Sequence, residues 1–183
     1  MMGPAAVWLA DGKRVHLQHG PIDLIVEAIG ADDSVKLAYR RARRRFGTVL
    51  DELVQELPRL RTCCPPRGLG LKGAVARRME QACRPHAGYG ITPMAAVAGA
   101  VADEVLAAMM DGPGLRRASV NNGGDIALAL GKGERCEIAM MGLPEAPVKL
   151  GTISLGADDP AGVATSGRHG RSHSLGIADS VTV

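Results

Sequence analysis

A change of hydrophobic periodicity near Gly114 is the feature that most limits the fold of this chain. Before Gly114, apart from one early strand, apolar residues recur with the spacing of amphipathic helices. After it, short β-branched runs alternate with turn signals such as "NNGG" and "GADDPAG", which is typical of strands joined by hairpins. We therefore predict an α+β fold, in which helices pack on a largely antiparallel sheet.

The limits of the expected elements follow from capping residues and helix breakers. Asp33 or Ser34 is the expected N-cap of the first helix, and Thr92 is that of the last, with Pro93 at its first helical position. Gly47 is a weak point in the first helix. Helices are expected over 32–60, 71–83 and 92–112. Residues 14–29 are expected to form two extended pieces interrupted at Gly20-Pro21, the second of them a buried strand over 23–29. Further strands are expected over 116–120, 125–130, 136–142, 149–155, 162–167 and 172–183.

The helix expected over 92–112 has a smooth surface, because alanine and glycine fill most of its first half. Glycine costs a helix about 1 kcal/mol relative to alanine, so Gly99 indicates a close neighbour, which is either the sheet or a ligand. Asp103 and Glu104 interrupt this apolar helix and point to different sides of it. At most one of the two acids is therefore expected to face a site.

Composition and charge restrict the partners. The 183 residues predict one domain with a substantial core. The chain has one Trp, two Tyr and one Phe, too few rings to favour a protein that binds single-stranded nucleic acid. A net charge of +3 does not by itself imply a polyanion. The arginine run "YRRARRR" over 39–45 is either a solvated helix face or an anion-facing patch.

The four cysteines follow no common zinc or disulfide spacing, so reduced thiols and a cytoplasmic location are expected. The N-terminal segment lacks the basic region of a signal peptide. No run approaches the ~20 apolar residues of a membrane helix, so no membrane contact is expected.

Two polar segments carry the candidate site. "NNGGD" over 121–125 is either a plain hairpin turn or a backbone cradle for a ligand. "GVATSGRHGRSHS" over 162–174 gathers hydroxyl groups that donate to phosphates, arginines that neutralise them, and histidines suited to proton transfer or metal binding. This segment could equally be a polar loop without chemistry. It is not a serine-hydrolase elbow, because no strand-to-helix pattern surrounds it.

Four blocks carry a family resemblance: "HGPIDLIVEA", "TPMAAVAGAVADEVL", "VNNGGDIALAL" and "GVATSGRHGRSHSLGIADSVTV". In this order they resemble a family of uncharacterised bacterial and archaeal proteins of the ApbE-like superfamily, whose named member is the FAD:protein FMN transferase. The resemblance covers about Val15 to Val183. It implies a single ApbE-like domain over 1–183.

The transferase's own motifs are met in part. Its "VN-x-GGD" segment is similar to 120–125, and its "ATSG" to 164–167. Its "KGYAVD" helix is echoed at Gly99 and Asp103, although Ala98 stands in place of the lysine. Transferases of this type continue after "SVTV" with a helix whose aspartate and threonine bind magnesium, whereas this sequence ends at Val183. Truncation at the C-terminus, or a partner chain that covers the last strand, are both left open.

The resemblance implies binding of FAD or a related flavin nucleotide, with magnesium as a second cofactor and a magnesium-dependent transferase reaction if the protein is active. Asp103 and His173 are the implied catalytic residues, and the metal ligands stay unknown. The implied cofactor-binding residues are Gly99, Asn121, Asn122, Gly123, Gly124, Asp125, Thr165, Ser166 and Gly167. A small-molecule nucleotide is the expected partner, and a homo-oligomer is left open. The alternative is a non-catalytic scaffold or assembly protein that kept the fold and lost the metal site.

Overall fold

A six-stranded antiparallel sheet forms one layer of the protein in the computed structural model, which describes residues 3–142, 148–166 and 181–182. The strand order is β1-β2-β3-β4-β5-β8, and every neighbouring pair is antiparallel. The strands are β1 (Ala5–Trp8), β2 (Val15–His19), β3 (Ile22–Gly30), β4 (Leu115–Asn122), β5 (Asp125–Leu130) and β8 (Gly162–Val163). The α+β prediction is confirmed.

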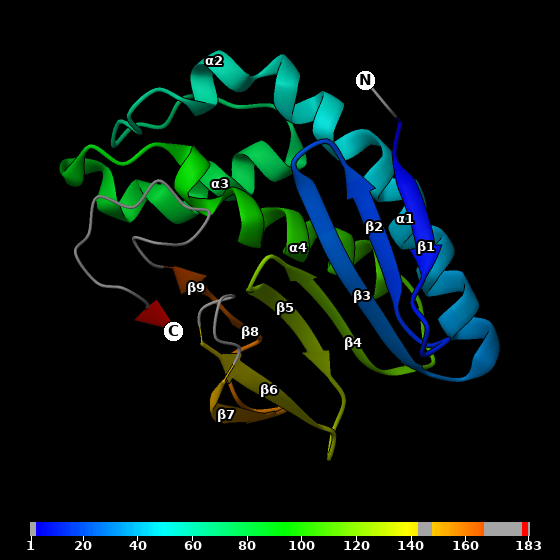
Figure 1. Ribbon diagram of the computed structural model, residues 1–183. Helices are drawn as coiled ribbons and strands as arrows, with labels where there is room; N and C mark the ends of the chain where they lie inside the picture. Colours follow the sequence, from blue (N-terminus) through cyan, green and yellow to red (C-terminus); the bar gives the residue numbers. More distant parts are fainter. Residues whose placement is uncertain (1–2, 143–147, 167–180, 183) are drawn as a thin grey trace.

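The helices cover one face of this sheet (Figure 1). They are α1 (Asp32–Gln55), α2 (Leu57–Leu60), α3 (Ala74–Cys83) and α4 (Val97–Met109), with the 3₁₀ helices η1 (Arg84–Tyr89) and η2 (Pro93–Ala96). On the other side of β5 lies a hairpin of β6 (Arg135–Met141) and β7 (Lys149–Gly156), whose apolar residues pack against Ile126, Leu128 and Leu130. The short β9 (Thr165–Ser166) pairs with β10 (Val181–Thr182).

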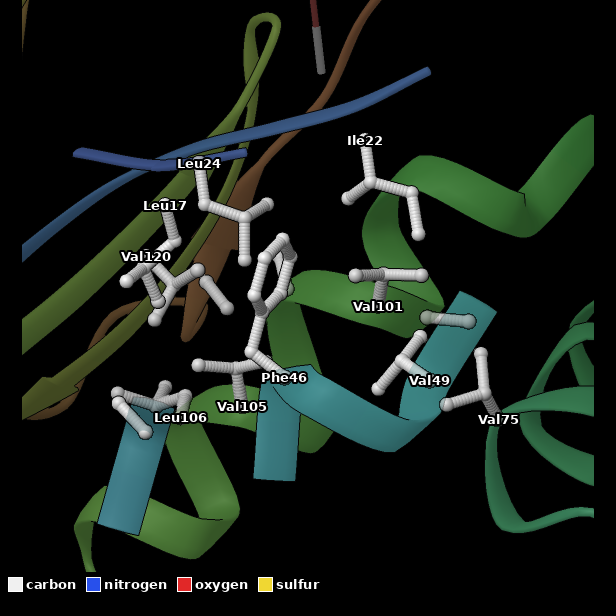
Figure 2. Close-up of a cluster of buried hydrophobic side chains, with 14 of the residues drawn as sticks. Leu17, Ile22, Leu24, Phe46, Val49, Val75, Val101, Val105, Leu106 and Val120 are labelled. Carbon is white, nitrogen blue, oxygen red and sulfur yellow. The ribbon is translucent and has the colours of Figure 1, made fainter. Parts of the chain in front are cut away.

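The main core lies between the helices and the inner face of the sheet. Alternate strand residues such as Leu17, Leu24 and Val120 point inward, as the two-residue period of a strand requires. They meet Phe46 of α1 and Val105 of α4, all of them at most 1% exposed (Figure 2). Because the core draws on all three long helices, the position of α4 is fixed from both the α1 side and the sheet side.

Several predicted helix limits are wrong, each for a local reason. The first helix ends at Gln55 rather than at residue 60, because Pro58 lacks an N–H and opens the separate α2. Its N-cap is Ala31, while Asp32 and Asp33 lie in the first turn, where the helix dipole favours acids. Helix α3 begins at Ala74, and the Glu56 carboxylate accepts from the N–H of Gly73 at 2.7 Å. The segment after Thr92 is a 3₁₀ turn before α4 begins at Val97.

The predicted strands differ from the observed ones at both ends of the chain. Strand β1 was not predicted, because its four residues lie at the sheet edge and show no alternation of burial. Trp8 of β1 packs edge-on against Tyr39 of α1, with ring centroids 5.0 Å apart. The strand expected over 162–167 divides into β8 and β9. Most of the strand expected over 172–183 lies outside the described residues.

Candidate functional site

The "NNGGD" segment is a hairpin turn that is anchored to α4. Asn122 pairs with Asp125 across the turn, and Gly123 and Gly124 take φ values of +64° and +111°, which side chains disfavour. The Asn121 side-chain oxygen accepts from the N–H of Gly124 at 2.9 Å. The Asn122 amide donates to the carbonyl of Ala98 at 3.0 Å. The Asn121 side chain therefore braces the turn from within, and the Asn122 side chain anchors it to the first turn of α4.

Asp125 follows the turn and lies half-buried beside Gly99. Its Oδ1 accepts from the N–H of Thr165 at 3.3 Å, and Gly99 also donates a backbone hydrogen bond to this carboxylate. Burial raises the pKa of Asp125, and these two hydrogen bonds offset the rise only in part. No cation faces the carboxylate among the described residues, so its negative charge is available to a ligand.

A hollow of about 250 Å³ opens in front of Asp125. Its lining consists of two carboxylates, four glycine or alanine residues and two β-branched apolar residues: Gly99, Asp103, Asp125, Ile126, Ala127, Gly162, Val163 and Ala164. Strand β8 forms one wall, and a Cβ on Gly162 would lie 2.6 Å from the carbonyl oxygen of Ile126, so only glycine permits this close strand pairing. The small residues leave backbone accessible to a ligand along the hollow.

Asp103 is the acid of α4 that faces this hollow, and it is exposed at the rim. Glu104 points away, toward Arg45 and Arg78, with which it forms ion pairs at 2.8 and 3.1 Å. Only one of the two adjacent acids therefore lies at this hollow, and whether the hollow is a binding site stays a prediction. Asp103 lies on α4 and Asp125 begins β5, so it is the tertiary structure that brings the two carboxylates to the same hollow.

The remaining predicted site residues are placed only in part. Thr165 is exposed, and its hydroxyl lies 3.3 Å from that of Thr182. Ser166 follows it on β9. Gly167 and His173 lie outside the described residues, so of the two implied catalytic residues the structure places Asp103 alone.

The charge of the hollow determines the kind of ligand it can hold. Two carboxylates and no lysine or arginine line it among the described residues, which favours a cation and disfavours a bare diphosphate. No group of three or more metal-binding side chains occurs in the part of the chain that the structure describes. Two carboxylates suit Mg²⁺, which protein sites commonly hold through one or two carboxylates together with phosphates and water.

Sequence reasoning missed two parts of this site. It placed the 162–167 segment in the candidate site but did not identify its pairing with β5, because the pairing of Val163 with Ile126 joins segments far apart in the chain. It also did not anticipate that the side chains of Asn121 and Asn122 are engaged within the protein.

No described helix combines the length and the apolar character that a transmembrane segment requires.

Comparison with known proteins gives a family. A sequence model of the family described as AbpE bacteria matches residues 6–183. The chain belongs to this family. A UPF0280 protein of Methanopyrus kandleri is 36% identical over 136 residues, which are 73% of this chain and 52% of that protein. A UPF0280 protein of Methanosarcina acetivorans is 39% identical over 111 residues, which are 60% of this chain and 41% of that protein. The chain thus spans about half the length of these relatives.

Membership of the AbpE bacteria family corrects the family resemblance drawn from the sequence. The chain was expected to be a relative of the FAD:protein FMN transferase in the ApbE-like superfamily, and that assignment is wrong. The matches are to a distinct family and to UPF0280 proteins, and they show no link to a flavin transferase. One of the motifs that suggested it, "VNNGGD", has a local role in the structure, because at 121–125 it forms a hairpin turn that docks on a helix.

Proposed function

We propose that the hollow beside Asp125 binds a small-molecule nucleotide through its diphosphate group and a divalent cation, magnesium being the expected ion. The observation that carries the proposal is the convergence of Asp103 and Asp125 on a hollow walled by small residues. The two carboxylates would hold the cation, and the cation would neutralise the diphosphate that they otherwise repel.

The size of the hollow supports recognition of the diphosphate end of the ligand. About 250 Å³ suits a hydrated cation with a diphosphate, whereas a whole dinucleotide such as FAD would extend beyond it. The exposed hydroxyl of Thr165 lies beside Asp125 and suits donation to a phosphate oxygen. A flavin nucleotide is the first candidate ligand. The four free cysteines support a reducing, cytoplasmic setting for the protein.

Isothermal titration calorimetry with FAD, in the presence and absence of magnesium, tests this proposal. We expect binding that requires magnesium. Asp125→Asn and Asp103→Asn should each weaken it by about tenfold or more, since each removes an anionic oxygen ligand of the cation. Asp158→Asn, which alters an exposed turn carboxylate away from the hollow, is the matched control and should leave the affinity unchanged.

Two outcomes would count against the proposal. Equal FAD binding by the wild-type and Asp125→Asn proteins would show that the carboxylates do not take part in binding. No binding of FAD or of other diphosphate nucleotides under any condition would favour the alternative, a non-catalytic scaffold that keeps the fold. Release of AMP from bound FAD would show turnover in addition to binding.

A further inference from the structure

A second hollow, of about 280 Å³, lies between α1 and α4. α1 provides most of its lining, and Ala108 of α4 and Asp111 just after α4 complete it. The lining residues are Arg41, Arg44, Arg45, Thr48, Ala108 and Asp111. The small side chain of Ala108 leaves the space open opposite the arginines. This hollow is rich in cationic groups, whereas the first is lined by carboxylates.

Arg45 is already neutralised and forms a fixed part of the lining. It donates to both carboxylate oxygens of Glu52 at 2.8 Å, and its Nε donates to Glu104 at 2.8 Å. It also donates to the Thr48 hydroxyl at 2.6 Å. With two carboxylates and a hydroxyl as acceptors, Arg45 has little capacity left for a further anion.

Arg41 and Arg44 keep positive charge available. The carboxylate contact of Arg41 among the described residues is Asp111, at 3.6 Å, and the Asp111 side chain is 79% exposed. Such a solvent-screened pair contributes little. Arg44 is exposed and has no ion pair in the part of the chain that the structure describes.

Arg41 is also held in position. Its side chain is only 24% exposed, and its NH1 lies so close to Gly112 that a Cβ there would be 2.8 Å away. Gly112 takes a φ of +147°, which favours glycine, and the absence of a side chain there leaves room for the Arg41 guanidinium to pack against it. A guanidinium whose orientation is fixed loses less entropy when it binds an anion.

The spacing of the arginines makes an anion favourable at this place. Arginines at 40, 41, 43, 44 and 45 include pairs three and four residues apart, which repel each other on a helix. Arg45 finds its counter-charges within the protein, while Arg41 and Arg44 face the hollow without full neutralisation. We propose that the hollow between α1 and α4 binds the phosphate or pyrophosphate group of a small molecule, held between the Arg41 and Arg44 guanidinium groups.

Calorimetric titration of inorganic pyrophosphate into the full chain tests this site, at low ionic strength and with EDTA present. Removal of divalent cations keeps the carboxylate-lined hollow out of the measurement. We expect Arg41→Gln and Arg44→Gln each to weaken binding about tenfold, as expected for the loss of a charge-assisted hydrogen bond. Asp111→Asn should strengthen binding, because it removes the competing carboxylate. Asp125→Asn should leave binding unchanged.

Arg40→Gln and Arg43→Gln are the matched controls, because both are exposed arginines of the same helix outside the hollow. They should change the affinity by less than about twofold at the salt concentration used. Equal losses for all four arginine variants would show general attraction to the helix and would overturn the proposal, as would no measurable binding of pyrophosphate. Tighter binding of an oligonucleotide or of anionic vesicles, weakened equally by Arg40→Gln, would assign the arginines to an extended surface instead. Should Arg41→Gln fail to fold, Arg44→Gln and Asp111→Asn still decide the matter.

Discussion

His19, the last residue of β2, shows what a single buried polar atom costs this protein. Its side chain is 7% exposed and packs edge-on against Phe46, with ring centroids 6.3 Å apart. The Nδ1 atom is buried and has no hydrogen-bond partner among the described residues. A buried polar atom left without a partner costs about 1–3 kcal/mol.

Replacement of His19 by leucine should therefore stabilise the fold. The change places an apolar side chain of similar size against Phe46 and removes the unpaired nitrogen. We expect the free energy of unfolding to rise by about 1 kcal/mol, as measured by urea denaturation followed by circular dichroism. His16→Leu is the control, because the partly exposed His16 has Asp23 as a partner at 2.8 Å and should gain nothing. A loss of stability in His19→Leu would mean that a bound water satisfies Nδ1.

At the scale of elements, Glu104 joins three helices. From α4 it accepts from Arg45 of α1 and from Arg78 of α3, and its side chain is only 15% exposed. Burial raises the pKa of Glu104, but the hydrogen bonds from the two arginines outweigh it, so the pKa lies below its usual value of 4.5. The carboxylate form is thus the one that holds these helices together.

Glu104→Gln should destabilise the protein by about 2 kcal/mol at pH 7, less than for a fully buried pair, because Arg78 is partly exposed. A group with a lowered pKa in the folded state contributes stability above its unfolded pKa and loses it as the pH falls through the folded value. The difference in melting temperature between wild type and variant should therefore shrink below pH 4.5.

Glu134→Gln serves as the control for this measurement, since the partner of Glu134, Arg116, is 67% exposed. Its effect should be close to zero at every pH. A pH-independent loss in Glu104→Gln would contradict the ionic role and indicate a packing defect.

Periodicity in the sequence predicts the elements better than it predicts their contacts. The apolar spacing of α1 and α3 and the short β-branched run of β3 give their type and most of their length. Strand β1 is not predicted, because Val7 and Trp8 are both more than half exposed at the sheet edge and the strand has no alternation of buried and exposed residues. The C-terminal end of α1 and the start of α3 are not predicted correctly. The first depends on Pro58, and the second on the distant Glu56 carboxylate.

The candidate site follows the same division. From the sequence, Gly99, the 121–125 turn and residues 165–167 are grouped as expected ligand-binding residues, and the structure brings Gly99, Asp125 and Gly162 around one hollow. The sequence does not indicate that Asn122 binds the Ala98 carbonyl, because that contact depends on how the hairpin docks. Residue type reveals which groups can bind a ligand, whereas the tertiary structure decides which remain available.

At the scale of the whole molecule, the apolar interior is divided unequally. The main core joins the helices and the sheet, while the β6–β7 hairpin rests on a small cluster with three buried residues, Leu128, Leu155 and Val163. Among the described strands, β6 and β7 pair only with each other. Opening of the hairpin therefore breaks fewer buried apolar contacts, and costs less free energy, than opening of β3 and β4.

Amide hydrogen exchange measured by mass spectrometry should show this difference. We expect the amides of β6 and β7 to exchange at least about tenfold faster than those of β3 and β4, because local opening exposes little apolar surface. The central strands are the internal reference. Equal protection would mean that the hairpin and the sheet unfold as one cooperative unit.

The contact between Trp8 and Tyr39 has a spectroscopic consequence. Trp8 is the chain's single tryptophan, and it is 57% exposed in the folded state. Its indole is already largely exposed to water, so the exposure of the core to water will itself contribute little to any change in its fluorescence emission. The emission will instead follow the separation of Trp8 from Tyr39, which now lie 5.0 Å apart. Intrinsic fluorescence in this protein is thus a local probe of whether the edge strand β1 is docked on α1.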